Sequence, residues 1–287
     1  MAATYNNLYL DTRQRLREAG VESAQLEARE LLCHAAGKTR EQFYRDMALY
    51  ASGQVEEKLS TLVERRLAGE PVAYLIGEWE FYGLTLEVTR DVLIPRMDTE
   101  VLAERAILLA RAAGEGARVL DLCAGSGCVG LAVAANVPDC RVVLADVSDA
   151  ALKVCRQNVR RHEFNARVTC VRADALAKPD AALWDFDVIA CNPPYIPTGE
   201  IDGLDVSVRD YEPRAALDGG PDGLDFYRAV AGGWGAALRL GGSLLFEVGI
   251  GQGRDVAVLL EQNGFEDIRL TQDTQGIPRV VEGVSNG

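Results

Sequence analysis

Residues 119–130 read Val119-Leu120-Asp121-Leu122-Cys123-Ala124-Gly125-Ser126-Gly127-Cys128-Val129-Gly130. The apolar residues at 118–122 predict a buried strand, and those at 128–136 predict a helix that follows it. Between them lies a glycine-rich turn, in which the missing side chains let a backbone come close to a ligand. A strand that enters a helix through such a turn is typical of a nucleotide-binding α/β domain.

Strands and helices alternate on both sides of this turn. We expect helices at 99–113, 149–162, 225–239 and 253–262, and strands at 141–145, 167–172, 186–191, 243–248, 267–271 and 279–282. Such alternation predicts an α/β fold with a parallel sheet and helices on both of its faces.

The first 70 residues have a different periodicity. Leu59, Leu62, Val63 and Leu67 share one helical face before Gly69, and Thr39 with Gln42 forms a capping-box pattern. These features predict a bundle of about four helices. From 74 to 89 the period changes to two, which indicates a β-hairpin. We therefore predict a helical domain at 1–72, a hairpin linker at 73–98 and a catalytic domain at 99–287.

Composition limits the location and the partners. The net charge is −13, which disfavours a nucleic-acid partner because phosphate contacts need Lys and Arg. No apolar run approaches the roughly 20 residues of a membrane span, and residues 1–11 lack a secretory signal, so we expect a cytoplasmic protein. The seven cysteines include no C-x-x-C pair, so no metal site is expected. His34 and His162 fall near predicted helix ends and are interpreted as structural.

The glycine-rich turn has two interpretations. Gly125, Gly127 and Gly130 fit the dinucleotide fingerprint, with Asp146 ending the next strand 21 residues after Gly125, so an NAD-binding oxidoreductase is one alternative. Asp121 favours the other, because a carboxylate at the end of a buried strand is costly without a partner. This D-x-x-x-G-x-G pattern resembles that of class I S-adenosylmethionine-dependent methyltransferases.

That resemblance implies a cofactor site. Its loop would be formed by Cys123, Ala124, Gly125, Ser126 and Gly127. Asp146 would bind the ribose hydroxyls, since a carboxylate accepts two hydrogen bonds from a diol. Asp174 would lie near the adenine. The alternative for Asp146 is that it only caps the helix that begins near residue 149.

A second motif, Asn192-Pro193-Pro194-Tyr195, ends the strand at 186–191. Carboxyl ends of strands are where open α/β sheets bind ligands. The Asn192 side-chain oxygen and the Pro193 carbonyl could accept the two hydrogens of a substrate NH₂ group, and Tyr195 could stack on its plane. We expect Asn192 also to contact the cofactor, and Asn192 to Tyr195 to form the substrate site. The alternative is a proline-rich turn without a functional role.

Longer segments resemble one family, the protein-(glutamine-N5) methyltransferases of peptide chain release factors. They are Gly77–Gly83, Val92–Glu100, Tyr211–Leu217, Gly223–Tyr227, Phe246–Gly249 and Arg279–Val281. The resemblance implies a Rossmann-like, mostly parallel seven-stranded sheet and a helical N-terminal domain that helps to bind the release factor. It also implies methylation of the glutamine in a Gly-Gly-Gln loop, with S-adenosylhomocysteine as coproduct, and places Ile94-Pro95-Arg96 beside the active site.

Two departures from the family pattern occur: Cys123 replaces a usual glycine, and Ala175 stands where an aromatic residue is frequent. Both put cofactor affinity in question. Two related activities stay open, glutamine methylation of a ribosomal protein and adenine-N6 methylation of DNA or ribosomal RNA. We expect a monomer whose partner is a release factor and which binds neither nucleic acid nor membrane directly.

Overall fold

The computed structural model describes residues 3–286, and the chain divides into two compact units. The first comprises the chain as far as Glu78 together with Asp205–Tyr211, and the second comprises Trp79–Leu204 and Glu212–Gly287. The segment 205–211 therefore packs with helices that lie more than a hundred residues earlier in the sequence.

The first unit is helical. Its helices are α1 (Tyr5–Glu18), α2 (Ala24–Ala36), α3 (Arg40–Asp46), α4 (Gly53–Leu67), α5 (Val72–Ile76) and the short α9 (Val206–Arg209). The predicted capping box is present, since the Thr39 side chain accepts from the Gln42 amide and the Gln42 side chain accepts from the Thr39 amide. Leu59, Leu62 and Val63 are buried on one face of α4, as their spacing predicts, whereas Leu67, predicted on the same face, is exposed.

Two details of this unit differ from the prediction. Five helices rather than about four precede residue 78 in the described part of the chain, and residues 74–76 belong to α5 rather than to a strand. Pro71 begins this single turn and Gly77 ends it in a left-handed conformation. A helix of five residues is too short to produce a periodic pattern.

The second unit begins with a hairpin and contains a seven-stranded sheet. β1 (Glu78–Phe81) pairs with β2 (Leu84–Glu87), which confirms a hairpin within 74–89. The strands of the large sheet are β3 (Arg118–Leu122), β4 (Arg141–Asp146), β5 (Val168–Arg172), β6 (Phe186–Cys191), β7 (Leu238–Glu247), β8 (Phe265–Gln272) and β9 (Pro278–Ser285). Their order is β5-β4-β3-β6-β7-β9-β8, and only the β7–β9 and β8–β9 pairs are antiparallel. The predicted α/β fold with a mostly parallel seven-stranded sheet is confirmed.

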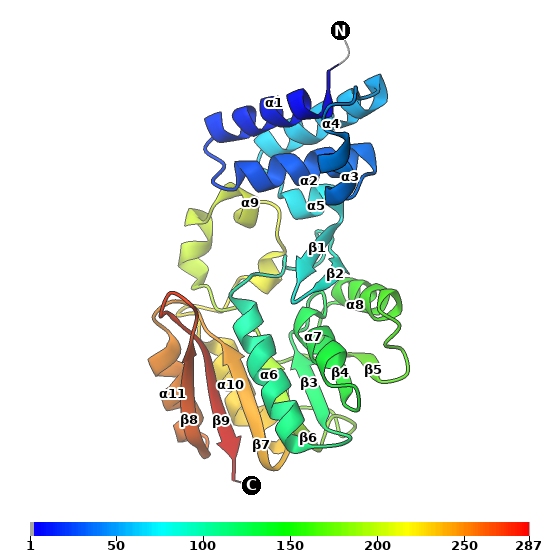
Figure 1. Cartoon of the computed structure of the whole chain (residues 1–287). Coiled ribbons are helices and arrows are strands. Elements are labelled where there is room, and N and C mark those ends of the chain that lie inside the picture. Colours follow the sequence, from blue (N-terminus) through cyan, green and yellow to red (C-terminus); the bar gives the residue numbers. More distant parts are fainter. Residues whose placement is uncertain (1–2, 287) are drawn as a thin grey trace. The chain divides into compact units, whose positions relative to one another are not determined.

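Helices cover both faces of this sheet (Figure 1). Helices α6 (Thr99–Ala113), α7 (Cys128–Asn136) and α8 (Asp149–Arg161) belong to one side, where α6 and α7 contribute to a large apolar core. Helices α10 (Asp225–Gly233) and α11 (Gly253–Gln262) contribute to the core on the opposite side. Trp234 and Tyr227 are fully buried there.

One helix and one strand differ most from the predicted bounds, whereas the ends of α8, β4, β5, β8 and β9 differ by at most three residues. The helix expected over 225–239 ends at Gly233 and continues as a 3-10 turn over Trp234–Ala237. Three of the four residues 232–235 are glycine, which is a poor helix former. β7 begins at Leu238 instead of 243, because Gly241 and Gly242 lie inside the strand at an irregularity of its register with β6.

The sheet order creates a switch point next to β3. From β3 the chain proceeds outward through β4 and β5, and it then returns to pair β6 with the other edge of β3. Leu122 and Cys191, the last residues of β3 and β6, are register partners. Ligands of open α/β sheets bind in the crevice outside the carboxyl ends of such strands. The residues that follow these two strands are therefore candidates for a site.

Membrane-spanning helices and metal-binding clusters are both absent from residues 3–286. Among them no helix has both the length and the apolar composition to span a bilayer. Nor do their histidines, cysteines and carboxylates gather in groups of three or more that could hold a metal ion.

Candidate active site

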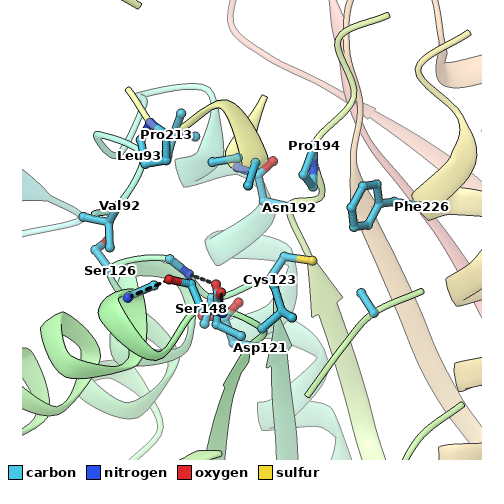
Figure 2. A pocket seen from close by; sticks show the side chains of 18 of the residues that line it. Val92, Leu93, Asp121, Cys123, Ser126, Ser148, Asn192, Pro194, Pro213 and Phe226 are labelled. Atoms are coloured by element: carbon cyan, nitrogen blue, oxygen red, sulfur yellow. Dashed lines mark hydrogen bonds between the residues drawn. The ribbon is translucent and has the colours of Figure 1, made fainter. Parts of the chain in front are cut away.

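A cavity of about 530 Å³ lies at this edge of the sheet, entirely within the second unit. Eight of the residues expected in the site line it, namely Cys123, Ala124, Gly125, Ser126, Asp146, Asp174, Asn192 and Pro194. Gly127, Pro193 and Tyr195 are not among the described residues of its lining. Figure 2 shows Asn192 and Pro194 in the same pocket as Cys123 and Ser126.

Asp121, near the end of β3, stabilises the glycine-rich turn with its carboxylate. Its carboxylate accepts a hydrogen bond of 2.8 Å from the backbone N–H of Gly130 in the first turn of α7. The residue is 2% exposed, and burial raises its pKa to about 7. The partner that burial demanded is thus a backbone amide. Asp121 holds the start of α7 against the end of β3.

Gly127 and Gly130 are required for different reasons. Gly127 is the N-cap of α7 and has φ +82°, in the left-handed region where a β-carbon is strained. A β-carbon on Gly130 would lie 2.3 Å from Cδ2 of Leu144 and 3.0 Å from Cγ1 of Val142. Helix α7 therefore packs on β4 more closely than a side chain at Gly130 would permit.

Asp146, the last residue of β4, presents its carboxylate at the cavity. Oδ2 accepts from the Gly125 amide and Oδ1 from the Ser148 amide, both at 2.9 Å. Each carboxylate oxygen has about two acceptor positions, so each keeps one for a ligand. The alternative role as a helix cap is wrong, because the Ser148 side chain caps α8 by accepting from the Ala151 amide.

The remaining cofactor candidates occupy the turn and the end of β5. Cys123 has φ +62°, so it adopts the left-handed conformation that explains why a glycine is common at this place. Asp174 is exposed, and its Oδ1 accepts from the Leu176 amide in a tight turn that also lines the cavity.

The Asn192 side chain is held by a residue that the sequence did not single out. Its Nδ2 donates to Oγ1 of Thr99, the first residue of α6, at 3.3 Å. Both residues line the cavity. Since the amide NH₂ is engaged in this way, its oxygen Oδ1 is left to accept hydrogen bonds from a ligand.

Tyr195 has contacts that differ from the expected stacking platform. Its hydroxyl donates to Oε1 of Glu247 at 3.4 Å, and its backbone carbonyl accepts from the Gln252 side chain at 2.9 Å. Burial raises the pKa of the Tyr195 phenol above its ordinary value. Pro193 is buried, and its carbonyl accepts no hydrogen bond from the other described residues.

The opposite wall comes from two segments that only the family resemblance had indicated. One contains Asp91, Val92, Leu93 and Pro95, and the other contains Pro213, Ala215, Ala216 and Asp218. Figure 2 shows Leu93 and Pro213 close together. The predicted position of Ile94-Pro95-Arg96 beside the site agrees with Pro95 in the lining.

A buried carboxylate joins these two segments. Glu212, whose side chain is 1% exposed, accepts from the Ile94 amide at 3.2 Å and forms an ion pair with Arg96. No periodicity marks this pair, because its members are 116 residues apart. The only signal in the sequence is their presence in two segments that resemble the same family.

Comparison with known proteins gives a consistent result. The model of the PrmC N-terminal domain matches residues 7–77, and the methyltransferase small domain model matches residues 99–205. A release factor glutamine methyltransferase from Geobacter sulfurreducens is 44% identical over 95% of this chain and 93% of its own length. Its counterpart from Caulobacter vibrioides is 36% identical over 100% and 98%.

A solved methyltransferase from Pyrococcus furiosus shares the fold alone, with a TM-score of 0.52 and 17% identity over 79% of this chain and 100% of that one. The sequence relatives go further, because they match nearly the full length of both partners. This chain therefore belongs to the family of release factor glutamine methyltransferases.

Proposed function

We propose that this enzyme transfers a methyl group from S-adenosylmethionine to the side-chain amide nitrogen of the glutamine in the Gly-Gly-Gln loop of a peptide chain release factor. One observation carries the proposal: the Asp146 carboxylate and the Asn192 amide line a single cavity at the switch point of the sheet. Two relatives that match the chain over most of its length are named for this activity.

The residues present suit the proposed cofactor. Each oxygen of Asp146 keeps an acceptor position for a ribose hydroxyl after bonding the Gly125 and Ser148 amides. The turn over 123–127 would follow the rest of the ligand, and Asp174 and Leu176 would flank its base. Bound S-adenosylmethionine supplies a methyl group already activated by a positively charged sulfur.

The acceptor site is polar at two defined atoms. Oδ1 of Asn192 and the carbonyl oxygen of Pro193 carry no hydrogen bond from the other described residues. An incoming primary amide has two N–H groups, and one would be donated to each oxygen. This arrangement fixes the plane of the amide and directs its nitrogen toward the cofactor.

Orientation then supplies much of the rate enhancement. Holding two reactants in a productive geometry is worth up to about 7–11 kcal/mol in intramolecular models. The nitrogen gains a methyl group and loses one proton, so the product amide carries one N–H. Because the departing group is a neutral thioether, a strong base is not required.

Mass spectrometry of a release factor incubated with enzyme and methyl donor tests this function. We expect a gain of one methyl group on the loop glutamine. Asn192→Ala should lose most of this activity, while calorimetry still detects the methyl donor. Asn165→Ala, an exposed asparagine outside the cavity, is the matched control. An unmodified glutamine after incubation with folded wild-type protein and saturating methyl donor would refute the proposal.

Two assays distinguish the two related activities from this one. Methylation of a ribosomal protein in place of the release factor would favour the first. Binding of DNA or RNA that weakens steeply with added salt would favour the second, although the net charge of −13 opposes it.

A further inference from the structure

A second pocket, of about 290 Å³, lies within the second unit at the amino ends of β3, β4 and β5. Arg118 begins β3, Arg141 begins β4 and Arg167 directly precedes β5, and all three line this pocket, which we call the arginine pocket. No carboxylate of the described residues lines it, although the chain has 43 acidic residues against 30 lysines and arginines. The cavity that contains Asp146 lies beyond the carboxyl ends of the same strands, so the two sites are separate.

The three arginines form one row across neighbouring strands. Arg118 and Arg141 are register partners, and Arg167 continues the row, since the residues that follow Arg141 and Arg167 are partners as well. Adjacent strands lie about 4.8 Å apart, so three long side chains in such a row can reach one ligand. Val143, two residues beyond Arg141, also lines the pocket, as expected for side chains on one face of a strand.

The guanidinium groups of this row keep most of their hydrogen-bond donors. Each group has five N–H donors. None of the three forms an ion pair with another described residue, and Asp187, which accepts from the Arg118 backbone amide, is paired with Arg239 instead. Arg118 and Arg167 each donate one side-chain N–H to a backbone carbonyl, at 3.2 and 3.3 Å. The row is therefore a concentration of positive charge whose remaining donors are available to an anion.

Aromatic rings hold two of the three groups in place. The Arg118 guanidinium carbon lies 5.4 Å from the centre of the buried Phe186 ring. That of Arg167 lies 4.8 Å from the centre of the Phe164 ring. The Nε atom of Arg118 is buried and has no acceptor among the described residues, which is unusual for a buried N–H group. An oxygen of a ligand in the arginine pocket would supply that acceptor.

The charges and donors of the row fit a phosphate group. A phosphate monoester has three terminal oxygens and a charge of about −1.5 to −2, whereas a carboxylate has two oxygens and one charge. Val143, Val171 and Leu183 offer the rest of the ligand an apolar wall. The volume lies close to the lower limit of small-molecule sites, about 300 Å³, and the net charge of −13 repels a long polyanion. Both favour a small organic phosphate over a nucleic acid.

We propose that the arginine pocket binds the phosphate group of a small organic phosphate, which Arg118, Arg141 and Arg167 hold by charge-assisted hydrogen bonds. The hydroxyl of Thr169, which also lines the pocket, is a further donor. This inference goes beyond the proposed function and does not rest on it, because the pocket shares no residue with the cavity at which methyl transfer is proposed.

Isothermal titration calorimetry of the full-length protein tests this site. The probes are glycerol 3-phosphate, glycerol, citrate as a compact polycarboxylate, and a short single-stranded RNA. A saturating concentration of S-adenosylhomocysteine is present, so that the probes do not enter the cavity at the carboxyl ends of the strands. Arg141→Ala is the principal variant, because the Arg141 side chain is exposed and bonds to no other described residue. Arg254→Ala, an exposed arginine of α11 outside the pocket, is the matched control.

We expect one glycerol 3-phosphate to bind per protein, with a Kd of about 1 mM or below at low salt that rises as sodium chloride is added. Arg141→Ala should raise this Kd by about 10-fold or more, because it removes a charged group of donors. Arg254→Ala should leave the Kd unchanged. Citrate and the RNA should bind more weakly than glycerol 3-phosphate, and glycerol, which lacks the phosphate, should not bind.

Each contrary result would overturn the proposal. Wild-type protein without saturable binding of glycerol 3-phosphate would show that the pocket is not a ligand site. An equal Kd in Arg141→Ala and in the wild type would show that the phosphate binds elsewhere. Tighter binding of citrate would assign the pocket to polycarboxylates, and tighter binding of the RNA would assign it to nucleic acid.

Discussion

Glu212 is expected to stabilise the second unit and to hold together the wall of the cavity. Its buried side chain accepts from the Ile94 amide and pairs with the Arg96 guanidinium. The perturbation is Glu212→Ala, which removes both interactions. Ile94 and Arg96 belong to the segment before α6. Pro213, Ala215 and Ala216, which follow Glu212 in the chain, line the cavity.

Two contributions set the magnitude. Hydrogen bonds to charged groups contribute about 1.5–3 kcal/mol, and a buried amide left without an acceptor costs about 1–3 kcal/mol. Only part of the charged hydrogen bond to Arg96 is lost as stability, because the Arg96 side chain is 37% exposed and water hydrates it when Glu212 is removed. We therefore expect the free energy of unfolding of the second unit to fall by about 3 kcal/mol.

Tryptophan fluorescence during a urea titration measures this change in the correct part of the chain. All three tryptophans, Trp79, Trp184 and Trp234, belong to the second unit, so their signal reports its unfolding. Glu200→Ala is the matched control, because Glu200 is an exposed glutamate of the same unit. The control should leave the midpoint within the range of ordinary surface substitutions, about ±0.5 kcal/mol.

If Glu212→Ala lowers the free energy of unfolding by less than about 1 kcal/mol, the reasoning is refuted, because a surface ion pair contributes as much. A double-mutant cycle with Arg96→Ala sharpens the test. Coupling of about 0.5–3 kcal/mol is expected for residues in direct contact. Strict additivity would show that the pair contributes nothing as a pair.

Two further predictions concern buried groups of the same unit. Burial raises the pKa of Asp121 and of Glu247 to about 7, so the folded state holds their protons where the unfolded chain has lost them. As pH rises from about 4 to 7, each of these groups should lower the free energy of unfolding by at most about 1.4 kcal/mol per pH unit. Asp121→Asn should therefore flatten the dependence of the free energy of unfolding on pH, measured by urea titration. An unchanged pH dependence would contradict the raised pKa of Asp121. Gly130→Ala should destabilise the protein by about 1–3 kcal/mol through overpacking against Leu144. Gly53→Ala is the control and should not destabilise it, because the space around its β-carbon is open. Equal thermal unfolding midpoints for the two variants would contradict close packing of α7.

Elements with local end signals could be predicted from the sequence. The bounds of α6, α7, α11 and β6 agree with the prediction to the residue. Glycine next to a helix end and the proline pair after β6 mark these boundaries through backbone conformation alone. The short α5 has such signals in Pro71 and Gly77, but the five residues between them are too few to form a period. In the first half of β7, Gly241-Gly242 has the composition of a turn.

The grouping of segment 205–211 with the N-terminal helices could not be predicted. Within that unit the Tyr211 hydroxyl donates to the Ala68 carbonyl at 3.2 Å, and Gly69 lies close to the Val206 side chain. These contacts join residues more than 130 positions apart. Domains predicted as consecutive ranges of residues cannot include a segment such as 205–211, which belongs to the first unit although the residues on both sides of it belong to the second.

For the site, the two motifs directed attention to the residues at the surface of the cavity and not to those beneath it. The argument that selected Asp121, a carboxylate that ends a buried strand and must have a partner, applies equally to Glu247 at the end of β7. The sequence therefore held a signal for Glu247. It held none for Tyr195 as its partner, because β6 and β7 lie side by side only when the sheet assembles, and the two residues are 52 positions apart. Burial cost predicts that a charged group has a partner, and the tertiary fold determines which one.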